Sequence, residues 1–221
     1  VIINFPPNGA YFEPSKTIVF QMEPWVNDAT KNWGVKTWGE WAEPEPSKFL
    51  AVRGRKSEHC NLVQNHTELT LTELNNPINF NKTKENTISS IMSNKYYDEG
   101  HILRINLLQY LEQKGDLSID IYGESNGFNF INYKGTLPQQ IKSKGYTSYK
   151  YYFMMENTFE KNYISEKLWD PIFCECLCFY YGCPNVTDYV DSKTFVLLDI
   201  NDFEKSYQII KQAIEEDWWS Q

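Results

Sequence analysis

The chain has 221 residues, a net charge of −8 at pH 7 and an aromatic content of 16%. This length permits a sizeable core in one large domain or two smaller lobes, and we favour two lobes. The excess of negative charge argues against a broad nucleic-acid footprint, and no apolar run is long enough for a membrane-spanning helix. We therefore expect neither a nucleic-acid partner nor a membrane segment in this chain.

The five cysteines do not resemble a disulfide framework, because their number is odd and Cys174, Cys176 and Cys178 stand two residues apart. We interpret these three as small buried thiols, since structural zinc sites usually show C-x-x-C pairs. A reduced, cytoplasmic setting follows from this interpretation. Because Val1 opens a strand directly, we expect the chain to begin inside a longer protein. Attachment to the Golgi or another membrane through a preceding segment is the alternative.

Residues 1–85 form the predicted N-terminal lobe, which is truncated or reduced because few strands are visible in it. Residues 25–47 are rich in Trp, Gly and Pro without a sustained period, which indicates an ordered loop region. The polar segment 65–86 is typical of a connection and places the lobe boundary near residue 85. The predicted strands of this lobe are 1–5, 17–22 and 48–52.

Strands and helices alternate in the second lobe, residues 86–221. A helix over 100–114 is predicted because Ile102, Ile105, Leu108 and Leu111 recur at three-residue steps, and Gly115 ends it. Alternation of this kind implies a parallel sheet with right-handed crossovers, and therefore an α/β, Rossmann-like lobe. The other predicted elements are strands at 86–92, 117–122, 151–155, 176–181 and 195–199, and helices after Ser165 and over 202–216.

The junction between the strand at 151–155 and the helix after Ser165 is the most informative stretch. The strand is apolar and aromatic without a helical period, which is typical of burial on both faces. Ser165 is a good N-cap residue, and a carboxylate follows it in the first turn. Ligands of open α/β sheets bind at strand carboxyl ends, and phosphates bind at helix N-termini. We therefore expect a nucleotide-type ligand in a crevice that is faced by Asn157, Tyr163, Glu166 and Lys167.

Pro171 lies six residues into this predicted helix. It removes an N–H that would bond the Lys167 carbonyl, so we expect either a kink or a second helix that Asp170 caps. Either arrangement leaves Lys167 near the first helix N-terminus.

The same stretch resembles the donor-binding motif of the α1,3-fucosyltransferases. The matching residues are Phe153, Glu156, Asn157 and the run Tyr163-Ile164-Ser165-Glu166-Lys167-Leu168-Trp169. The resemblance implies a GT-B-like protein of two Rossmann-like lobes that moves fucose from GDP-fucose to a glycan hydroxyl with inversion. It also implies a nucleotide-sugar donor, a glycan acceptor, and no metal or other cofactor. The predicted donor-binding residues are Ser93, Asn94, Tyr151, Asn157, Tyr163 and Glu166.

Inverting sugar transfer needs a base, a stabilised oxocarbenium-like sugar and a neutralised diphosphate. Lys167 at the helix N-terminus is the first candidate for the diphosphate. Arg104 is the second, because Ser93-Asn94 followed by Arg104 is similar to a segment of the family in which Ser, Asn and Arg reach the diphosphate. The alternative is that Arg104 lies on a solvated helix face and that Ser93-Asn94 only forms a turn.

Glu23 is the predicted base, since Glu23-Pro24 at the end of a strand resembles the family's Glu-Ser-Pro, with Pro in place of Ser. Partial desolvation would raise the pKa of such a carboxylate toward a useful range. Its rivals are Glu13, Glu40, Glu43 and Glu45. The predicted catalytic residues are thus Glu23, Arg104 and Lys167.

Two other functions remain open from the sequence. One is a non-catalytic glycan-binding domain on a degenerate transferase scaffold, which would use the cluster Trp33, Trp38 and Trp41. The other is a transferase with a different donor, such as a UDP-sugar. Nucleotide binding separates the first alternative from an enzyme, and a comparison of donors separates the second.

Overall fold

The computed structural model describes residues 1–4, 6–7, 9–22, 44–54, 63–76, 80–97, 99–137 and 141–221. Its internal contacts divide the chain into two units, Val1–Leu62 with Glu160–Tyr163, and Val63–Phe159 with Ile164–Gln221. The lobe boundary that the sequence places near residue 85 does not coincide with the division after Leu62, and it stays a prediction. Each unit is described by itself below.

The smaller unit contains a three-stranded parallel sheet in the order β1-β2-β3. Its strands are β1 (Ile2–Ile3), β2 (Ile18–Phe20) and β3 (Ala51–Arg53). Ile2, Val19 and Phe49 are buried between them. The strand predicted at 48–52 starts too early, because Pro46–Lys48 forms a 3-10 turn with proline at its opening, where its fixed φ is favourable.

The larger unit is built on six parallel strands in the order β6-β5-β4-β7-β8-β9. The strands are β4 (Lys84–Met92), β5 (Ser118–Gly123), β6 (Tyr133–Gly135), β7 (Tyr149–Met155), β8 (Leu177–Tyr181) and β9 (Phe195–Leu197). The chain builds outward in one direction from β4 and then in the other from β7, which is the strand order of doubly wound nucleotide-binding folds. The predicted parallel α/β sheet is confirmed, and its topological switch point lies between β4 and β7.

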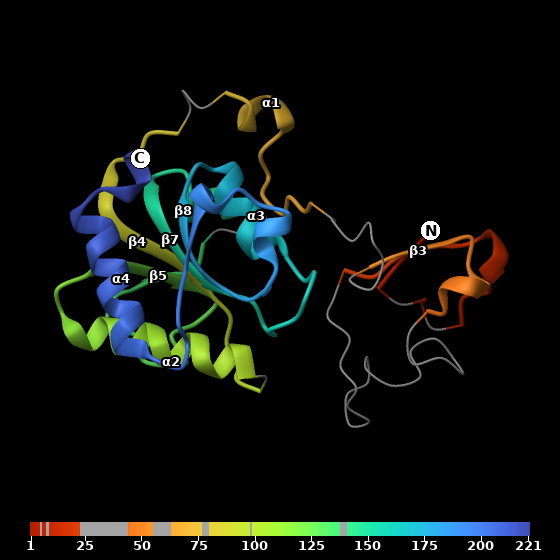
Figure 1. Ribbon diagram of the computed structural model, residues 1–221, viewed down its shortest axis with the longest axis horizontal. Coiled ribbons are helices and arrows are strands. Elements are labelled where there is room, and N and C mark those ends of the chain that lie inside the picture. The colour runs from red at the N-terminus through yellow and green to blue at the C-terminus, as the bar shows by residue number, and fades with distance from the viewer. Residues whose placement is uncertain are drawn as a thin grey trace. The chain divides into compact units, whose positions relative to one another are not determined.

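Helices cover both faces of this sheet, with α2 and α4 on one face and α3 on the other (Figure 1). The helices are α1 (Leu71–Leu74), α2 (Glu99–Lys114), α3 (Glu166–Phe173) and α4 (Phe203–Glu215). The predicted helix at 100–114 is therefore confirmed as α2. No helix among the described residues has the length and apolar character needed to cross a membrane.

The start of α3 is also confirmed, because the Ser165 hydroxyl caps it by accepting from the Lys167 N–H. The second helix proposed after Asp170 is wrong, since α3 continues through Pro171 as one helix. The short helix α1 falls in the segment predicted as a polar connection. Its sequence signal was a capping box, in which Thr70 and Glu73 exchange side-chain and backbone hydrogen bonds.

All seven residues of β7 are buried, which confirms the prediction of a strand covered on both faces. Tyr151 and Phe153 belong to the core beneath α2 and α4, whereas Tyr152 and Met154 belong to the core beneath α3. Residues that alternate along a strand point to opposite faces of the sheet, so β7 joins the two cores. The second core also contains Cys174, Cys176 and Cys178, which are free and buried, as predicted.

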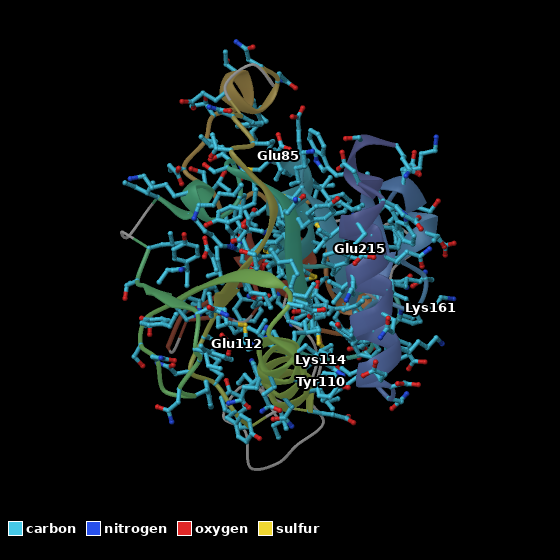
Figure 2. The ribbon with its side chains drawn as sticks, turned by 90° about the vertical axis from the view of Figure 1, so that its left-hand side faces the viewer. Glu85, Tyr110, Glu112, Lys114, Lys161 and Glu215 are labelled. Carbon is cyan, nitrogen blue, oxygen red and sulfur yellow. The ribbon has the colours of Figure 1, made fainter. Side chains whose placement is uncertain are left out.

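Side chains on α2 tie this helix to α4. Tyr110 and Lys114 both lie on α2 (Figure 2), and both donate to the Glu204 carboxylate on α4 at 2.5 Å. These two hydrogen bonds lower the pKa of Glu204 to about 2. Helices α2 and α4 are thus linked by charge as well as by their apolar faces.

Candidate active site

The ends of β4 and β7 define the candidate site. Ser93 and Asn94 follow β4, and Glu156 and Asn157 follow β7, its neighbour in the sheet. In doubly wound sheets, ligands bind in the crevice outside the strand carboxyl ends at the switch point. The structure therefore brings together two segments that lie about sixty residues apart in the sequence and that were each predicted to contact the donor.

The N-terminus of α2 lies directly against the end of β7 at Gly100. A Cβ at this position would lie 2.5 Å from the carbonyl carbon of Asn157 and closer still to the carbonyl oxygens of Glu156 and Asn157. Only a residue without a side chain permits this approach. The positive dipole end of α2 is thereby held beside the switch point, where an anion would be stabilised.

Arg104 follows Gly100 by one helical turn and is buried at 4% exposure. Its Nη1 donates to the carbonyl oxygen of Met155, the last residue of β7, at 3.2 Å. The alternative of a solvated helix face is therefore wrong. Burial of a guanidinium requires hydrogen-bonded partners, and this contact places the charge of Arg104 at the end of β7.

The N-terminus of α3 is fastened to β7 by a buried carboxylate. Glu156 is fully buried and accepts hydrogen bonds from the Ser165 N–H at 2.8 Å and the Ser165 hydroxyl at 2.7 Å. Burial raises the pKa of Glu156, against the opposing effects of Lys167 and Ser165. Gly182, after β8, leaves room for this side chain, because a Cβ there would lie 2.5 Å from the Glu156 Cγ. The strand-to-helix junction is thus rigid around Glu156.

Lys167 lies in the first turn of α3 with its ammonium group near three partners. Its Nζ is 3.2 Å from the Ser165 hydroxyl oxygen, 3.6 Å from a Glu166 carboxylate oxygen and 3.9 Å from a Glu156 carboxylate oxygen. The side chain is about one quarter exposed, at 24%. Lys167 therefore presents a partly exposed cation at a helix N-terminus, where its ammonium group is shared between the Glu166 and Glu156 carboxylates.

Glu166 is the acidic residue of the same turn. Burial disfavours its charged form, but Lys167 and Lys142 outweigh burial and hold the pKa of Glu166 below its ordinary value. The Lys142 ammonium lies 3.9 Å from the Glu166 carboxylate and 2.7 Å from that of Asp170, which is fully buried one turn later in α3. Sequence reasoning missed the roles of Lys142 and Asp170, because Lys142 lies outside the motif.

Asn94 and Asn157 differ in their surroundings. The Asn94 amide donates to the Ser125 hydroxyl at 2.7 Å, so the loop after β5 contacts the loop after β4. The side-chain oxygen of Asn157 is buried and accepts no hydrogen bond from the part of the chain that is described. A buried amide oxygen of this kind is costly unless a ligand or water pairs with it. Asn157 thus suits a ligand donor group, and Ser125 is an addition to the predicted set.

Residues 81–215 match the family model described as glycosyltransferase family 10 (fucosyltransferase), C-terminal part. This match covers more than half of the chain. The chain belongs to glycosyltransferase family 10. The resemblance inferred from the motif around Glu156 and Lys167 is therefore confirmed.

Relatives of this family 10 chain include two proteins named GDP-fucose protein O-fucosyltransferase 3. The one from Xenopus laevis is 28% identical over 92 residues, which are 37% of this chain and 18% of that protein. The one from Homo sapiens is 30% identical over 102 residues, which are 42% of this chain and 19% of that protein. The matched region thus spans less than a fifth of either relative.

Solved structures of α1,3-fucosyltransferases share the fold of this family 10 chain. One with GDP has a TM-score of 0.60 at 16% identity and covers 95% of this chain and 65% of its own. One with GDP-fucose has a TM-score of 0.50 at 21% identity and covers 63% of this chain and 38% of its own. The predicted GT-B-like α/β fold is confirmed by this likeness.

Tyr151, Tyr163 and Glu23 are the remaining residues that were predicted for the family 10 site. Tyr151 is enclosed in the core, and its hydroxyl lies 3.2 Å from both the Ala213 carbonyl oxygen and an Asp217 carboxylate oxygen, which share its single hydrogen as acceptors. It lies four residues before the end of β7, about 13 Å at 3.3 Å per residue. Tyr163 is buried and belongs with Glu160–Tyr163 to the smaller unit. Glu23, the predicted base, lies outside the described residues.

Two further groups of predicted residues also lie wholly or partly outside the described ranges. The Trp cluster of the glycan-binding alternative, at positions 33, 38 and 41, is outside them. So are Glu40 and Glu43, rivals of Glu23. Glu13 is described, and its carboxylate pairs with Lys16 at 2.8 Å next to a 3-10 turn, which is a local surface contact. Glu45 accepts from the Ser47 hydroxyl at 2.6 Å in a similar local arrangement.

Proposed function

We propose that this chain carries the donor side of a fucosyltransferase, which moves fucose from GDP-fucose to an acceptor hydroxyl with inversion and without a metal. One observation carries the proposal: Arg104 and Lys167 lie at the two strand-to-helix connections that meet at the switch point. Each cation stands within a turn or so of a helix N-terminus, which adds its own positive potential. Membership of glycosyltransferase family 10 supports this assignment.

The leaving diphosphate is the part of the reaction that these residues suit best. As the bond between the fucose anomeric carbon and the diphosphate oxygen breaks, negative charge accumulates on GDP. Lys167, Arg104 and the N–H groups at the start of α2 would stabilise that charge in the way that metal ions do in other transferases. Arg104 offers a planar fork of donors, and Lys167 offers a more mobile point charge.

The remaining donor contacts would come from neutral and acidic groups. Ser93 and Asn94 follow β4 on the diphosphate side, and the buried amide of Asn157 would bond a donor hydroxyl or phosphate oxygen. The Glu166 carboxylate, which is held ionised, would accept a hydrogen bond from a hydroxyl of fucose or ribose. These contacts orient the sugar for attack from the face opposite the diphosphate.

Inversion requires a base on that opposite face. The base would accept the proton of the acceptor hydroxyl while its oxygen forms the new bond to the anomeric carbon, and GDP would leave with the old bond's electron pair. Glu23 is proposed for this role from its position after a strand in the sequence. A carboxylate in a partly desolvated cleft is a suitable base near neutral pH.

The acceptor is proposed to be a hydroxyl of a glycan or of a protein. The motif favours a glycan, because it resembles enzymes that act on sugar hydroxyls. The relatives named GDP-fucose protein O-fucosyltransferase 3 favour a protein hydroxyl. Transfer of radiolabelled fucose to a panel of free glycans and folded glycoprotein domains would distinguish the two.

Calorimetric titration with GDP, GDP-fucose, GDP-mannose and UDP-sugars tests the proposal. We expect GDP and GDP-fucose to bind, and Lys167→Met to weaken GDP about 10- to 150-fold, because a hydrogen bond to a charged group contributes about 1.5–3 kcal/mol. Lys193→Met, at an exposed lysine in the 3-10 turn before β9, is the matched control and should bind as the parent does.

Two results would contradict the proposal. One is the absence of binding by every nucleotide and nucleotide sugar to a folded protein. The other is equal GDP affinity of Lys167→Met and Lys193→Met. Tighter binding of a UDP-sugar than of GDP-fucose would keep the transferase assignment but replace the donor.

A further inference from the structure

Lys142 lies in a 3-10 turn, Lys142–Gly145, that is separated from α3 in the sequence by the whole of β7. Its ammonium group nevertheless reaches α3, where it lies 2.7 Å from Asp170 and 3.9 Å from Glu166. The two carboxylates are four residues apart, so they stand one above the other on the same face of the helix. Lys142 thus bridges two successive turns of α3.

Asp170 fixes the position of this lysine. Its carboxylate is fully buried and uses both oxygens, because one accepts from Lys142 and the other accepts from the backbone N–H of His66 at 2.8 Å. A buried carboxylate needs such partners, and removing one of them would leave an uncompensated charge. Burial raises the pKa of Asp170, and the Lys142 ammonium opposes that rise.

The turn that carries Lys142 is itself held in place. The Ser143 N–H and hydroxyl both donate to the Glu68 carboxylate, and the Ser143 carbonyl accepts from the N–H groups of Tyr146 and Thr147 at 2.9 Å. The segment with His66 and Glu68 therefore binds both α3, through the His66 N–H, and the turn, through the Glu68 carboxylate. Lys142 is presented to Glu166 from a rigid support and has lost much of the rotamer freedom of a surface lysine.

The charge of Lys142 is already balanced by Asp170, so this lysine is poorly suited to bind a phosphate directly. The Lys142 ammonium group also acts electrostatically on the Glu166 carboxylate, which lies 3.9 Å away. We propose that Lys142, anchored by Asp170, is a positioning residue that fixes the Glu166 carboxylate for hydrogen bonding to hydroxyls of the sugar donor. The inference rests on the proposed donor site and adds to it a residue from outside the motif.

Several charged or titratable groups act on Glu166 from the elements around it. Lys167 and Lys142 favour its charged form, and His66 does so when protonated. The charge of Glu166 in turn helps to raise the pKa of three neighbouring groups, Glu156, Asp170 and the buried Tyr146 hydroxyl. Because burial also works against ionisation of Glu166, the loss of one lysine shifts the balance toward the protonated acid, which no longer accepts two hydrogen bonds.

Carbon-13 NMR of the glutamate side-chain carboxyls tests the step from Lys142 to Glu166 without any ligand. The Glu166 signal is assigned with Glu166→Gln. In the parent protein we expect Glu166 to titrate below the range of ordinary glutamates. In Lys142→Met its pKa should rise by about one unit or more, as expected for loss of an opposite charge within 4–6 Å.

Lys144→Met is the matched control, because Lys144 is an exposed lysine of the same turn. It should leave the titration of Glu166 unchanged. Lys142→Arg keeps the positive charge and should restore most of the low pKa. A parent protein in which Glu166 titrates like an ordinary glutamate overturns the inference even if Lys142→Met does not fold.

GDP-fucose titration between pH 5 and pH 8 tests the step from Glu166 to the donor. Lys142→Met should lose at least threefold more affinity at pH 5 than at pH 8 relative to Lys144→Met, since the ionised Glu166 accepts from donor hydroxyls more strongly than the protonated acid does. Equal pH dependence of these two variants would overturn the positioning role. If the parent binds no nucleotide sugar but its Glu166 responds to Lys142, the proposed function fails while the electrostatic link stands.

Discussion

Gly100→Ala tests whether the close approach of α2 to β7 builds the site. The added methyl group would lie 2.5 Å from the Asn157 carbonyl carbon and closer to two carbonyl oxygens. Ordinary carbon contacts begin near 3.4 Å, so α2 must withdraw from the end of β7 by about 1 Å. Backbone atoms cannot rotate out of the way as a flexible side chain can. The substitution should therefore move the helix N-terminus and Arg104 together.

The energetic effect combines two opposite contributions. Overpacking of this kind costs about 1–3 kcal/mol. Alanine is favoured over glycine in a helix by up to about 1 kcal/mol, which offsets part of that cost. At about 2–4 °C per kcal/mol for a chain of this size, we expect the unfolding midpoint to fall by a few degrees.

Differential scanning calorimetry and GDP titration measure the two consequences of Gly100→Ala. We expect a lower midpoint and at least a tenfold weaker affinity for GDP, because a donor site is sensitive to displacements of about 1 Å. Gln113→Ala, at an exposed position of the same helix, controls for helix propensity and should keep the parent affinity. A higher midpoint for Gly100→Ala with unchanged GDP affinity would refute the reasoning, since helix propensity alone would then account for the result.

Two predictions concern residues away from the donor. Glu204→Gln should lower the unfolding midpoint at pH 7 and lower it much less at pH 2. The pKa of Glu204 is lowered to about 2, so its contribution is fully present above the ordinary glutamate pKa and is lost as the pH falls through 2. Thermal scans across this range check it against Glu215→Gln, and a gap that is as large at pH 2 as at pH 7 would contradict it. Tyr151→Phe should lower the midpoint by about 2–4 °C, because the lost hydrogen bond contributes about 1 kcal/mol, and should leave GDP affinity unchanged. A tenfold loss of GDP affinity at an unchanged midpoint would restore the donor-binding role predicted for Tyr151.

The features that could be predicted from the sequence are those that depend on residues close together in the chain. Ser165 is recognisable as an N-cap because a small hydroxyl residue precedes an acidic first turn, and the strand before it is recognisable because its apolar run has no helical period. The parallel arrangement of the strands also followed, since alternating strands and helices imply crossover connections. These signals were sufficient to locate the strand-to-helix junction that follows Glu156.

The features that were missed depend on contacts between distant segments. Lys142 is one of two lysines in a short turn, and only the three-dimensional structure shows that it reaches Asp170 while Lys144 is exposed. Tyr151 illustrates a related difficulty, and its donor-binding role stays a prediction. In a strand whose every residue is buried, alternation no longer tells which aromatic side chain faces a ligand and which faces a helix, and Tyr151 faces α4.

The buried Glu156 explains how a site for an anion can include a carboxylate. Its two hydrogen bonds from Ser165 join β7 to α3, so the helix N-terminus has one position relative to the sheet. Lys167 remains 3.9 Å away, beyond a direct hydrogen bond, and is therefore attracted to Glu156 without being bound by it. The carboxylate thus orders the junction and preorganises the cation, and the positive end of α3 is left to the diphosphate. Asp170 differs from Glu156 in this respect, because one turn further along the helix it binds Lys142 directly, at 2.7 Å.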